Sequence, residues 1–414
     1  MGDAGIERLV EQAARAARAA AAEIAAADAA AIRSALEQMA ANLTARAEPV
    51  LAANREDVAE GERAGMAQAL LDRLRLDEGR MAAMARQIEA LAAGPDLDPV
   101  AATWTLHDGT RVEERRRPVG VIGANYEARP NVTVDVASQL IKSRNAGVLR
   151  TGSAALRSAL ALLDEVIRPA LAGAGLDPAA VQVVRSPDRA AAYALCSLPR
   201  LVPLVIIRGS GPTTAALSRH AAAHGVRTLA HAEGGGVLFV DRAADVGTAH
   251  AIIRRSLDRL GVCNRLNLLL VAEQRYEELL PGILGVLSDL GVRASLPPHA
   301  HPRGHEWALD EGHEATVTVD RARDALDAAA IANEETSGIA AGIVTEDEAA
   351  AEAFLAAFAG TGAFWNVTTR RLDGFELTAA PETGINVDHA PGPRGPVTYR
   401  DLYLRQYVVR RPAP

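Results

Sequence analysis

The sequence predicts an α/β protein made of two doubly wound units with parallel sheets. Its 414 residues exceed the size at which a single core stops growing. The composition is 49% hydrophobic with a mean hydropathy of +0.02, which is typical of a globular protein. Short apolar runs alternate with helical patterns of about 10 to 20 residues, and this alternation predicts strands joined by crossover helices.

Composition also limits the partners and the compartment. No apolar run is long enough to cross a bilayer, and the N-terminal residues lack the order of a secretory signal. Two cysteines, Cys196 and Cys263, do not make a disulfide scaffold, so a reducing cytoplasm is the expected location. The net charge of −8 argues against nucleic acid or an anionic membrane as the main partner. We therefore expect a cytoplasmic protein that acts on a small molecule.

The chain begins with helices and continues into a hairpin. Residues 5–60 are rich in Ala, the best helix former, and predict two or three helices with breaks at Asn42 and Asn54. Residues 104–113 show a strand-like alternation of side chains on both sides of Asp108-Gly109, and this pattern predicts a β-hairpin. Residues 403–409 alternate weakly and could add a strand to this hairpin. A projecting hairpin is often an assembly element, so these segments are candidates for a dimer interface.

The first α/β unit follows the hairpin. Its apolar runs predict strands at residues 118–123, 147–150, 181–184 and 201–207. Between and after them, helical patterns cover residues 132–143, 154–172, 189–195 and 213–224. This order predicts a parallel sheet with helices on its faces.

The second unit repeats the pattern and carries Cys263 on a connector. Strands are predicted at 237–241, 266–271 and 315–319, and helices at 249–260, 276–290 and 322–333. Gly261 could end the helix that precedes Cys263. Loops often carry catalytic groups, so Cys263 is a candidate nucleophile. The alternative is that it packs as a small hydrophobe, as we expect for Cys196 before Pro199.

Three other segments are candidates for ligand contacts. The turn at residues 206–211 follows a strand and precedes a helix. It either binds an anion or is an ordinary turn in which glycines relieve backbone strain. Arg150 ends a strand and is either a phosphate-binding cation or a solvated side chain. Residues 296–305 contain three His, but their Pro-rich composition favours a surface loop without a metal.

The run from Pro118 to Asp135 closely resembles a segment of the γ-glutamyl phosphate reductases, which belong to the aldehyde dehydrogenase superfamily. Further segments resemble the same family and occur in the family's order over nearly the whole chain. These segments are residues 141–146, 262–264, 343–347, 366–370, 373–376 and 394–396.

The resemblance implies an aldehyde dehydrogenase-like fold in three parts. An NADP-binding domain would cover residues 1–228, interrupted by the hairpin arm at about 100–116. A catalytic domain would cover 229–365, and residues 366–414 would return to the cofactor domain and end in an oligomerisation strand. The implied reaction is NADPH-dependent reduction of L-glutamyl 5-phosphate to L-glutamate 5-semialdehyde and phosphate, in proline biosynthesis, by a homodimer or homotetramer.

The resemblance also implies catalytic roles. Cys263 would be the nucleophile, and a thiolate that expels phosphate leaves a thioester, which accepts hydride more readily than a carboxylate. Each addition places negative charge on the former carbonyl oxygen, so a hydrogen-bond donor is needed. Asn131 and the backbone N–H of Cys263 would supply it. The competing role for Asn131 is to cap the helix from Val132.

The cofactor residues implied by the resemblance lie in three places. Arg150, with Gly152 and Ser153, would stand near the adenosine ribose and favour NADP(H). Gly209 and Gly211 would lie near the pyrophosphate. Asp310 is the candidate for holding the nicotinamide ribose.

Departures from the family pattern lie near the expected pockets. Ala230 stands where the superfamily carries a general base, with Glu233 three residues later; a reductase that releases phosphate does not need this base. Segments 259–262, 337–341 and 296–314 differ from the family, and Arg394 lacks a preceding His unless His389 substitutes. Two alternatives therefore remain: a reductase of a related amino-acyl phosphate or acyl thioester, and a catalytically silent oligomeric paralogue.

Overall fold

The structure, a computed structural model, describes residues 2–209, 211–231, 234–310, 312–387 and 392–411. The chain divides into two compact units. Unit 1 comprises residues 1–230, 378–384 and 397–414, and unit 2 comprises residues 231–377 and 385–396. The chain returns to unit 1 later than residue 366, because the amide of Asn264 donates to the carbonyls of Arg370 and Leu372 and holds that segment in unit 2.

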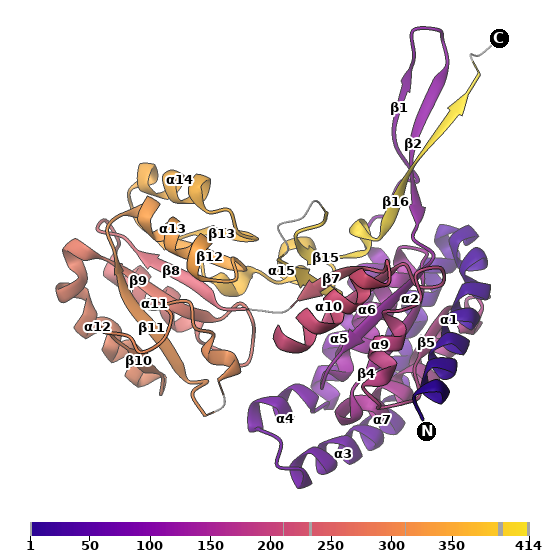
Figure 1. Cartoon of the computed structure of the whole chain (residues 1–414), viewed down its shortest axis with the longest axis horizontal. Helices are drawn as coiled ribbons and strands as arrows, with labels where there is room; N and C mark the ends of the chain where they lie inside the picture. Colours follow the sequence, from indigo (N-terminus) through magenta and orange to yellow (C-terminus); the bar gives the residue numbers. More distant parts are fainter. Residues whose placement is uncertain (1, 210, 232–233, 311, 388–391, 412–414) are drawn as a thin grey trace. The chain divides into compact units, whose positions relative to one another are not determined.

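Unit 1 begins with helices (Figure 1). They are α1 (Asp3–Ala26), α2 (Ala29–Ala45), α3 (Ala47–Arg63), α4 (Gln68–Leu74) and α5 (Glu78–Ala93). The predicted breaks at Asn42 and Asn54 are wrong, since both residues lie inside helices. Their side chains donate to carbonyls of other elements, at 3.1 Å to Val166 and 2.8 Å to Leu74, and this tertiary bonding outweighs the local preference of Asn. The chain instead breaks before Asp28, which caps α2.

A parallel sheet forms the centre of unit 1. Among the described residues its strand order is β5-β4-β3-β6-β7. The strands are β3 (Val121–Tyr126), β4 (Ala146–Thr151), β5 (Val181–Val183), β6 (Leu204–Arg208) and β7 (Arg227–His231). The intervening helices are α6 (Pro130–Lys142), α7 (Leu156–Ala161), a π-helical turn (Leu162–Ile167), α8 (Arg168–Gly173), α9 (Ala190–Leu195) and α10 (Gly211–Ala223). Buried residues of these helices, of α1 and of the sheet form one apolar core.

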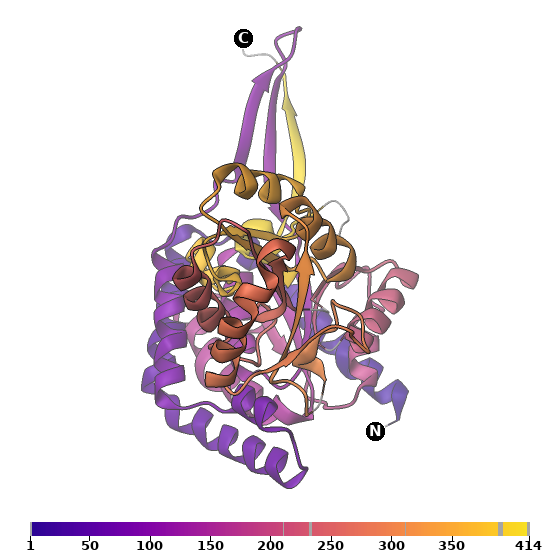
Figure 2. The ribbon, with the colours of Figure 1, turned by 90° about the vertical axis from the view of Figure 1, so that its left-hand side faces the viewer.

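The predicted hairpin and its additional strand are confirmed. Strands β1 (Val100–Thr105) and β2 (Arg111–Pro118) pair antiparallel around Gly109, whose φ of 83° suits the tight turn. Strand β16 (Tyr403–Arg410) pairs antiparallel with β2 along its whole length. The three strands stand side by side in Figures 1 and 2 and project from unit 1 as an arm.

Unit 2 contains a second parallel sheet, with strand order β10-β11-β9-β8-β12-β13 in the described part of the chain. The strands are β8 (Gly236–Val240), β9 (Leu266–Ala272), β10 (Arg293–Ser295), β11 (Thr316–Ala322), β12 (Ala340–Val344) and β13 (Gly362–Trp365). The helices are α11 (Val246–Ser256), α12 (Tyr276–Asp289), α13 (Ala325–Glu335), α14 (Glu348–Ala357) and α15 (Gly374–Thr378). Two short strands, β14 (Gly384–Asn386) and β15 (Gly395–Val397), pair with each other.

The side chains of β9 divide between the two faces of this sheet. Leu269 and Val271 join an apolar cluster with residues of α11 and α12. Leu268 and Leu270 join another cluster with residues of α13 and α14. Helices therefore cover both faces, and the predicted doubly wound α/β fold is confirmed.

The helix before Cys263 is shorter than predicted. It ends at Ser256, so Gly261 does not terminate it. The N–H of Leu257 bonds the carbonyl of Arg254, which tightens the last turn, and the Ser256 hydroxyl lies 2.8 Å from that of Thr368. Cys263 therefore lies on a longer connector than the pattern indicated.

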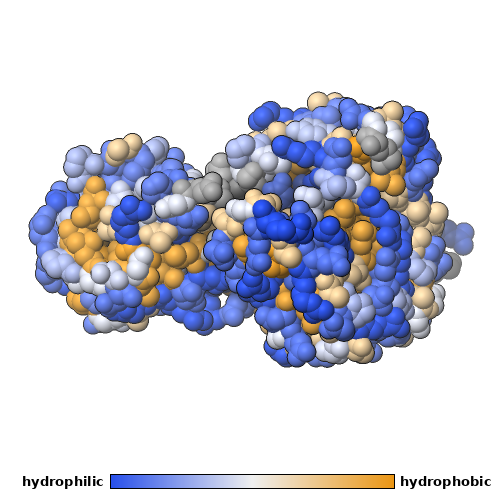
Figure 3. Space-filling view, turned by 90° about the horizontal axis from the view of Figure 1, so that it is seen from below, coloured by the Kyte–Doolittle hydropathy of each residue, from blue (hydrophilic) through white to orange (hydrophobic). Residues whose placement is uncertain are grey.

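None of the helices in the described ranges is long and apolar enough to span a bilayer. On the face drawn in Figure 3, hydrophobic residues occupy limited areas bordered by hydrophilic ones. Several of the exposed large apolar side chains gather on the arm, where Leu404 is 54% and Val409 61% exposed.

Candidate functional site

A pocket of about 370 Å³ lies in unit 1 at the carboxyl ends of β3 and β4. The chain passes from β3 to β4 and β5 on one side and then to β6 on the other, so β3 and β6 flank the switch point where open α/β sheets bind ligands. Helices α9 and α10 supply the other wall. The lining residues are Asn125, Glu127, Ala128, Arg150, Gly152, Ser153, Ala154, Pro187, Arg189, Ala192, Tyr193, Thr213 and Leu217.

Arg150 is buried beside this pocket, so the interpretation as a solvated strand-end arginine is wrong. It is 4% exposed. Its Nη1 donates to Oδ1 of Asn125 at 3.2 Å, and its Nη2 donates to the carbonyls of Pro187 and Asp188 at 2.9 and 3.0 Å. Burial lowers the pKa of Arg150, and the negative charges of Glu127 and Asp188 act in the opposite direction. The guanidinium thus ties the 187–188 turn to the sheet.

Several buried polar atoms around the pocket have no hydrogen-bond partner among the residues that the structure describes. They are Nδ2 of Asn125, Nε of Arg150 and Oγ1 of Thr214. Asn125 and Thr214 are each 1% exposed, and leaving such groups unpaired is unfavourable. A ligand with hydroxyl or phosphate oxygens would satisfy the two donors that line the pocket. The chemistry of the site therefore fits the sugar and phosphate groups of a nucleotide.

The structure brings some of the predicted cofactor residues together. Gly152 and Ser153 line the pocket beside Arg150. Gly209 and Gly211 are not among its lining residues. A Cβ on Gly209 would lie 3.7 Å from the carboxyl carbon of Glu127, and Gly211 is the first residue of α10. Their predicted place near a pyrophosphate stays a prediction.

Sequence reasoning missed Asn125 and the wall formed by α9 and α10. The available signal for Asn125 was a polar side chain inside an otherwise apolar strand. No comparable signal marks Tyr193, Thr213 and Leu217. These residues line the pocket only because the crossover of the chain places α9 beside α10.

Asn131 lies in the first turn of α6. The helix begins at Pro130 after Arg129, so the interpretation of Asn131 as the cap of a helix from Val132 is wrong. Its Nδ2 donates to Oδ2 of Asp135 at 2.9 Å. An amide nitrogen carries two hydrogens, so this bond leaves one further donor on Asn131.

Cys263 lies in unit 2 at the amino end of the sheet. Its carbonyl accepts a hydrogen bond from the N–H of Gly235 at 2.7 Å, and that of Arg265 accepts one from Gly236 at 2.6 Å. The half-buried thiol packs against an apolar cluster of Ile339, Ala340, Leu372 and Ile385. The connector is therefore held on both sides, by backbone hydrogen bonds and by the amide of Asn264.

Gly234 and Glu306 lie close to Cys263. A Cβ on Gly234 would stand 2.6 Å from the carbonyl oxygen of Cys263 and 2.8 Å from its Cα. The same point lies 2.8 Å from Oε1 of Glu306, so this carboxylate is near the cysteine backbone. Sequence reasoning gave no role to Glu306. Its neighbour Trp307 is bound through its N–H to Oδ1 of Asn267 at 3.0 Å, which fixes the segment beside β9.

Asp310 lies among histidines. It accepts from Nε2 of His305 at 3.1 Å and pairs with Nδ1 of His313 at 3.3 Å. The bond from His305, followed by that from His313, lowers the pKa of Asp310. His301 and His305 pack edge-on against Trp307 at 4.7 and 4.5 Å. In the described ranges no group of three or more His, Cys, Asp or Glu residues could hold a metal ion.

Other predicted residues lie elsewhere. Ala230 is in β7, whereas Glu233 and His389 fall outside the described residues. Cys196 is fully buried after α9, and burial raises its pKa to about 12. Its prediction as a packing residue is confirmed.

The family comparison supports a single assignment. The model of the aldehyde dehydrogenase family matches residues 3–300. A γ-glutamyl phosphate reductase of Caulobacter vibrioides is 37% identical over 391 residues, which cover 91% of this chain and 92% of that protein. The enzyme of the same name from Clavibacter michiganensis subsp. michiganensis is 37% identical over 98% of this chain and 94% of its own length.

A solved structure shows the same architecture. The crystal structure of γ-glutamyl phosphate reductase from Thermotoga maritima is similar with a TM-score of 0.87 and 29% identity. The match covers 97% of this chain and 98% of that one. The likeness therefore extends over both units.

Proposed function

Because this chain belongs to the aldehyde dehydrogenase family, and within it to the γ-glutamyl phosphate reductases, we propose that Cys263 and the pocket of unit 1 together carry its reaction. The reaction is the reduction of L-glutamyl 5-phosphate to L-glutamate 5-semialdehyde and phosphate, in proline biosynthesis. The observation that carries the assignment of residues is the pocket at the switch point, with its unpaired donors on Asn125 and Arg150.

We assign the covalent steps to Cys263. Its thiolate attacks the acyl carbon, the bond from that carbon to the phosphate oxygen breaks, and phosphate leaves with the bonding electrons. The product is a thioester on the sulfur. After hydride reaches its carbonyl carbon, the carbon–sulfur bond breaks, the aldehyde forms and the thiolate returns. No water is activated in this sequence, which is consistent with Ala230 at the place of the superfamily's base.

Asn131 and the N–H of Cys263 are assigned to the oxygen that becomes negative in each addition. A donor aimed at such an oxygen contributes about 3 to 4 kcal/mol in well-studied enzymes. The bond from Asn131 to Asp135 would orient the amide and leave its second hydrogen for this purpose.

The cofactor of the family is a nicotinamide nucleotide, and we propose NADP(H). It supplies the hydride when bound. The wall of Ala192, Tyr193 and Leu217 offers apolar surface for a flat base, and Gly152 and Ser153 border the sugar end. Gly209, Gly211 and Asp310 are assigned to the remaining phosphate and ribose contacts.

We also propose a homodimer or homotetramer assembled through the arm, in the cytoplasm. The exposed apolar side chains of β16 support it, because a projecting sheet with such residues gains from being covered by a second copy.

The reverse reaction tests the proposal. The protein is incubated with L-glutamate 5-semialdehyde, NADP+ and phosphate, and NADPH is followed by absorbance. We expect turnover that requires phosphate and is lost in Cys263→Ala. Turnover that requires coenzyme A in place of phosphate would support an acyl-thioester reductase instead. Absence of turnover with every aldehyde would support a silent paralogue.

A further inference from the structure

Two arginines line the pocket of unit 1 and differ in how their charges are used. Arg150 is buried, and its Nη1 and Nη2 donate to Asn125 and to the 187–188 turn. Arg189 is exposed and belongs to the same lining. Within the described ranges, no residue accepts a hydrogen bond from the Arg189 guanidinium. Nη1 and Nη2 of Arg150 thus serve the fold of the pocket and leave only its Nε for a ligand, whereas the whole guanidinium of Arg189 offers donors to a ligand.

The charges around the pocket favour an anion near Arg189. The charged residues in the lining are Glu127, Arg150 and Arg189. The positive charge of Arg189 acts on Arg150 and disfavours its protonation, while Glu127 and Asp188 favour it. The effect of Arg189 is the smallest of these, so Glu127 and Asp188 compensate the charge of Arg150, and the charge of Arg189 is the one in the lining that an anion would pair with.

A phosphate monoester is a dianion of this kind. It carries a charge of about −1.5 to −2 at pH 7 and offers three acceptor oxygens. The planar guanidinium of an arginine can donate two parallel hydrogen bonds to such a group. A nucleotide without this phosphate would present only ribose hydroxyls, which gain little from a second cation.

We infer that Arg189 binds the 2′-phosphate of the nucleotide and sets the preference for NADP(H) over NAD(H), whereas Arg150 positions the 187–188 turn that carries Arg189. The inference rests on the proposed use of NADP(H). It moves the phosphate contact that the resemblance gave to Arg150 onto Arg189, because Nη1 and Nη2 of Arg150 are bonded to the protein and leave only its Nε for the ligand.

Equilibrium binding of ligands without a nicotinamide tests this inference apart from catalysis. Wild type and Arg189→Gln are titrated by calorimetry with 2′,5′-ADP and with 5′-AMP. Loss of a charge-assisted contact is expected to weaken 2′,5′-ADP binding about 10- to 100-fold and to leave 5′-AMP binding within about twofold. Arg189→Lys, which keeps the charge but not the planar fork, should restore part of the affinity.

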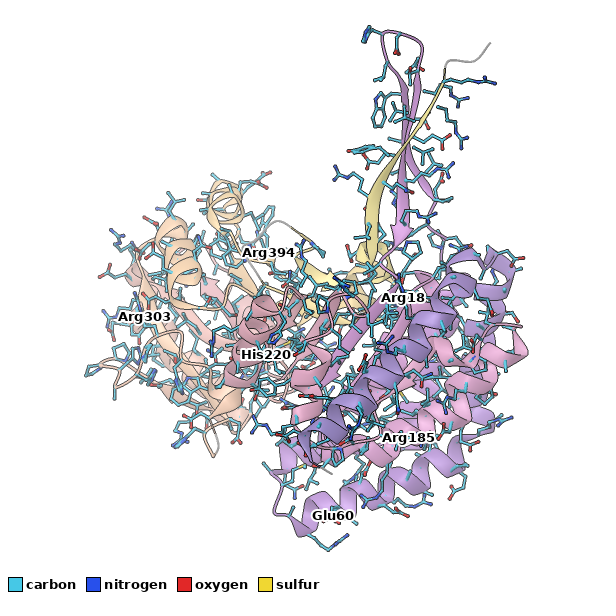
Figure 4. All side chains as sticks on the ribbon, turned by 45° about the vertical axis from the view of Figure 1, so that its right-hand side comes forward. Arg18, Glu60, Arg185, His220, Arg303 and Arg394 are labelled. Atoms are coloured by element: carbon cyan, nitrogen blue, oxygen red, sulfur yellow. The ribbon has the colours of Figure 1, made fainter. Side chains whose placement is uncertain are left out.

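The matched control is Arg185→Gln. Arg185 lies four residues away, is paired with Asp164 at 2.9 Å and is not among the lining residues (Figure 4). The Arg185→Gln variant should bind 2′,5′-ADP and 5′-AMP with the affinities of the wild type. Equal loss of both ligands in Arg189→Gln, or no loss of 2′,5′-ADP binding, would overturn the role of Arg189. If wild type binds 5′-AMP as tightly as 2′,5′-ADP, the proposed NADP(H) preference fails, and the inference fails with it.

Discussion

The guanidinium of Arg150 donates to Oδ1 of Asn125 over 3.2 Å, while Nδ2 of the same amide is buried and has no partner among the described residues. One side of the Asn125 amide therefore serves the fold, and the other side is available to a ligand. This division allows the two roles to be separated by substitution.

Asn125→Asp keeps an acceptor for Arg150 and removes the Nδ2 donor. We expect NADP+ affinity to fall about tenfold, because one hydrogen bond to the ligand is lost, while the free energy of unfolding changes little. Calorimetric titration and urea unfolding measure the two quantities. Asn125→Ala also removes the acceptor and should lower the unfolding free energy by about 1 to 3 kcal/mol. Unchanged NADP+ affinity in Asn125→Asp would show that Nδ2 does not contact the ligand.

The two cysteines should differ sharply toward a thiol reagent. Cys196 is fully buried with its pKa raised to about 12 by burial, so almost none of it is thiolate at neutral pH. Cys263 is half-buried. Ellman's reagent should therefore modify one thiol quickly in the native protein, and none in Cys263→Ser. The control Cys196→Ser should retain the fast thiol; a fast reaction of Cys196 would contradict its burial.

Gly234→Ala should disrupt the cysteine connector. The new Cβ would stand 2.6 Å from the carbonyl oxygen of Cys263, so the backbone of the connector must move. A displacement of about 1 Å at a reacting group can cost 100-fold in rate, and we expect kcat to fall by about that factor. Nucleotide binding in unit 1 should persist. Gly285→Ala, where a Cβ meets nothing within 4 Å, is the control and should keep full activity.

Glu306→Gln removes a negative charge near Cys263. A neighbouring carboxylate disfavours a thiolate, so the variant should react with iodoacetamide faster than wild type at pH 7, by about two- to tenfold. Both proteins carry Cys196→Ser, so that the initial rates of alkylation compare Cys263 with and without the carboxylate of Glu306. Glu277→Gln, which removes an exposed carboxylate paired with Arg321, should leave the rate unchanged. A slower rate in Glu306→Gln would instead indicate that the carboxylate accepts the thiol proton.

His220 on α10 should titrate below its usual range (Figure 4). Burial first, and then the charge of His224, lowers its pKa below the ordinary 6.5. The unfolded chain binds a proton at higher pH than the folded one, so this residue stabilises the fold above about pH 6.5 and ceases to do so as the pH falls through its lowered pKa. Proton NMR of the ring should give a midpoint below 6.5. In His220→Gln, the loss of unfolding free energy from pH 7 to 5 should be smaller.

Much of the fold could be predicted from local pattern. The apolar runs of β3, β4, β8 and β9 are buried on both faces, and the turn at Asp108-Gly109 needs only its two residues to specify it. The helix ends were harder, because Asn42 and Asn54 receive their bonding partners from segments distant in sequence. Local preference carries no information about such partners.

The sequence predicted site residues whose role follows from the chemistry of the side chain. It did not predict contacts that arise only when the fold brings distant segments together. Arg150 was found as a cation at a strand end, yet two of its three acceptors are carbonyls of residues 187–188, which lie far from it in the sequence. Glu306 approaches the Cys263 connector because Asn267 binds its segment through the backbone. Neither relationship has a signature in the spacing of the residues.

The sheet of the arm joins β2 to β16, and the whole of unit 2 lies between these strands in the sequence. During synthesis, β2 leaves the ribosome long before its partner, so its edge stays open while about 290 further residues are made. The arginines and glutamates of β2 place charges along this unpaired edge, and these charges disfavour pairing with other nascent chains. Strand β16 can pair with β2 only after unit 2 has been synthesised. A complete arm is therefore present only in chains that contain both units, and only such chains would assemble through it.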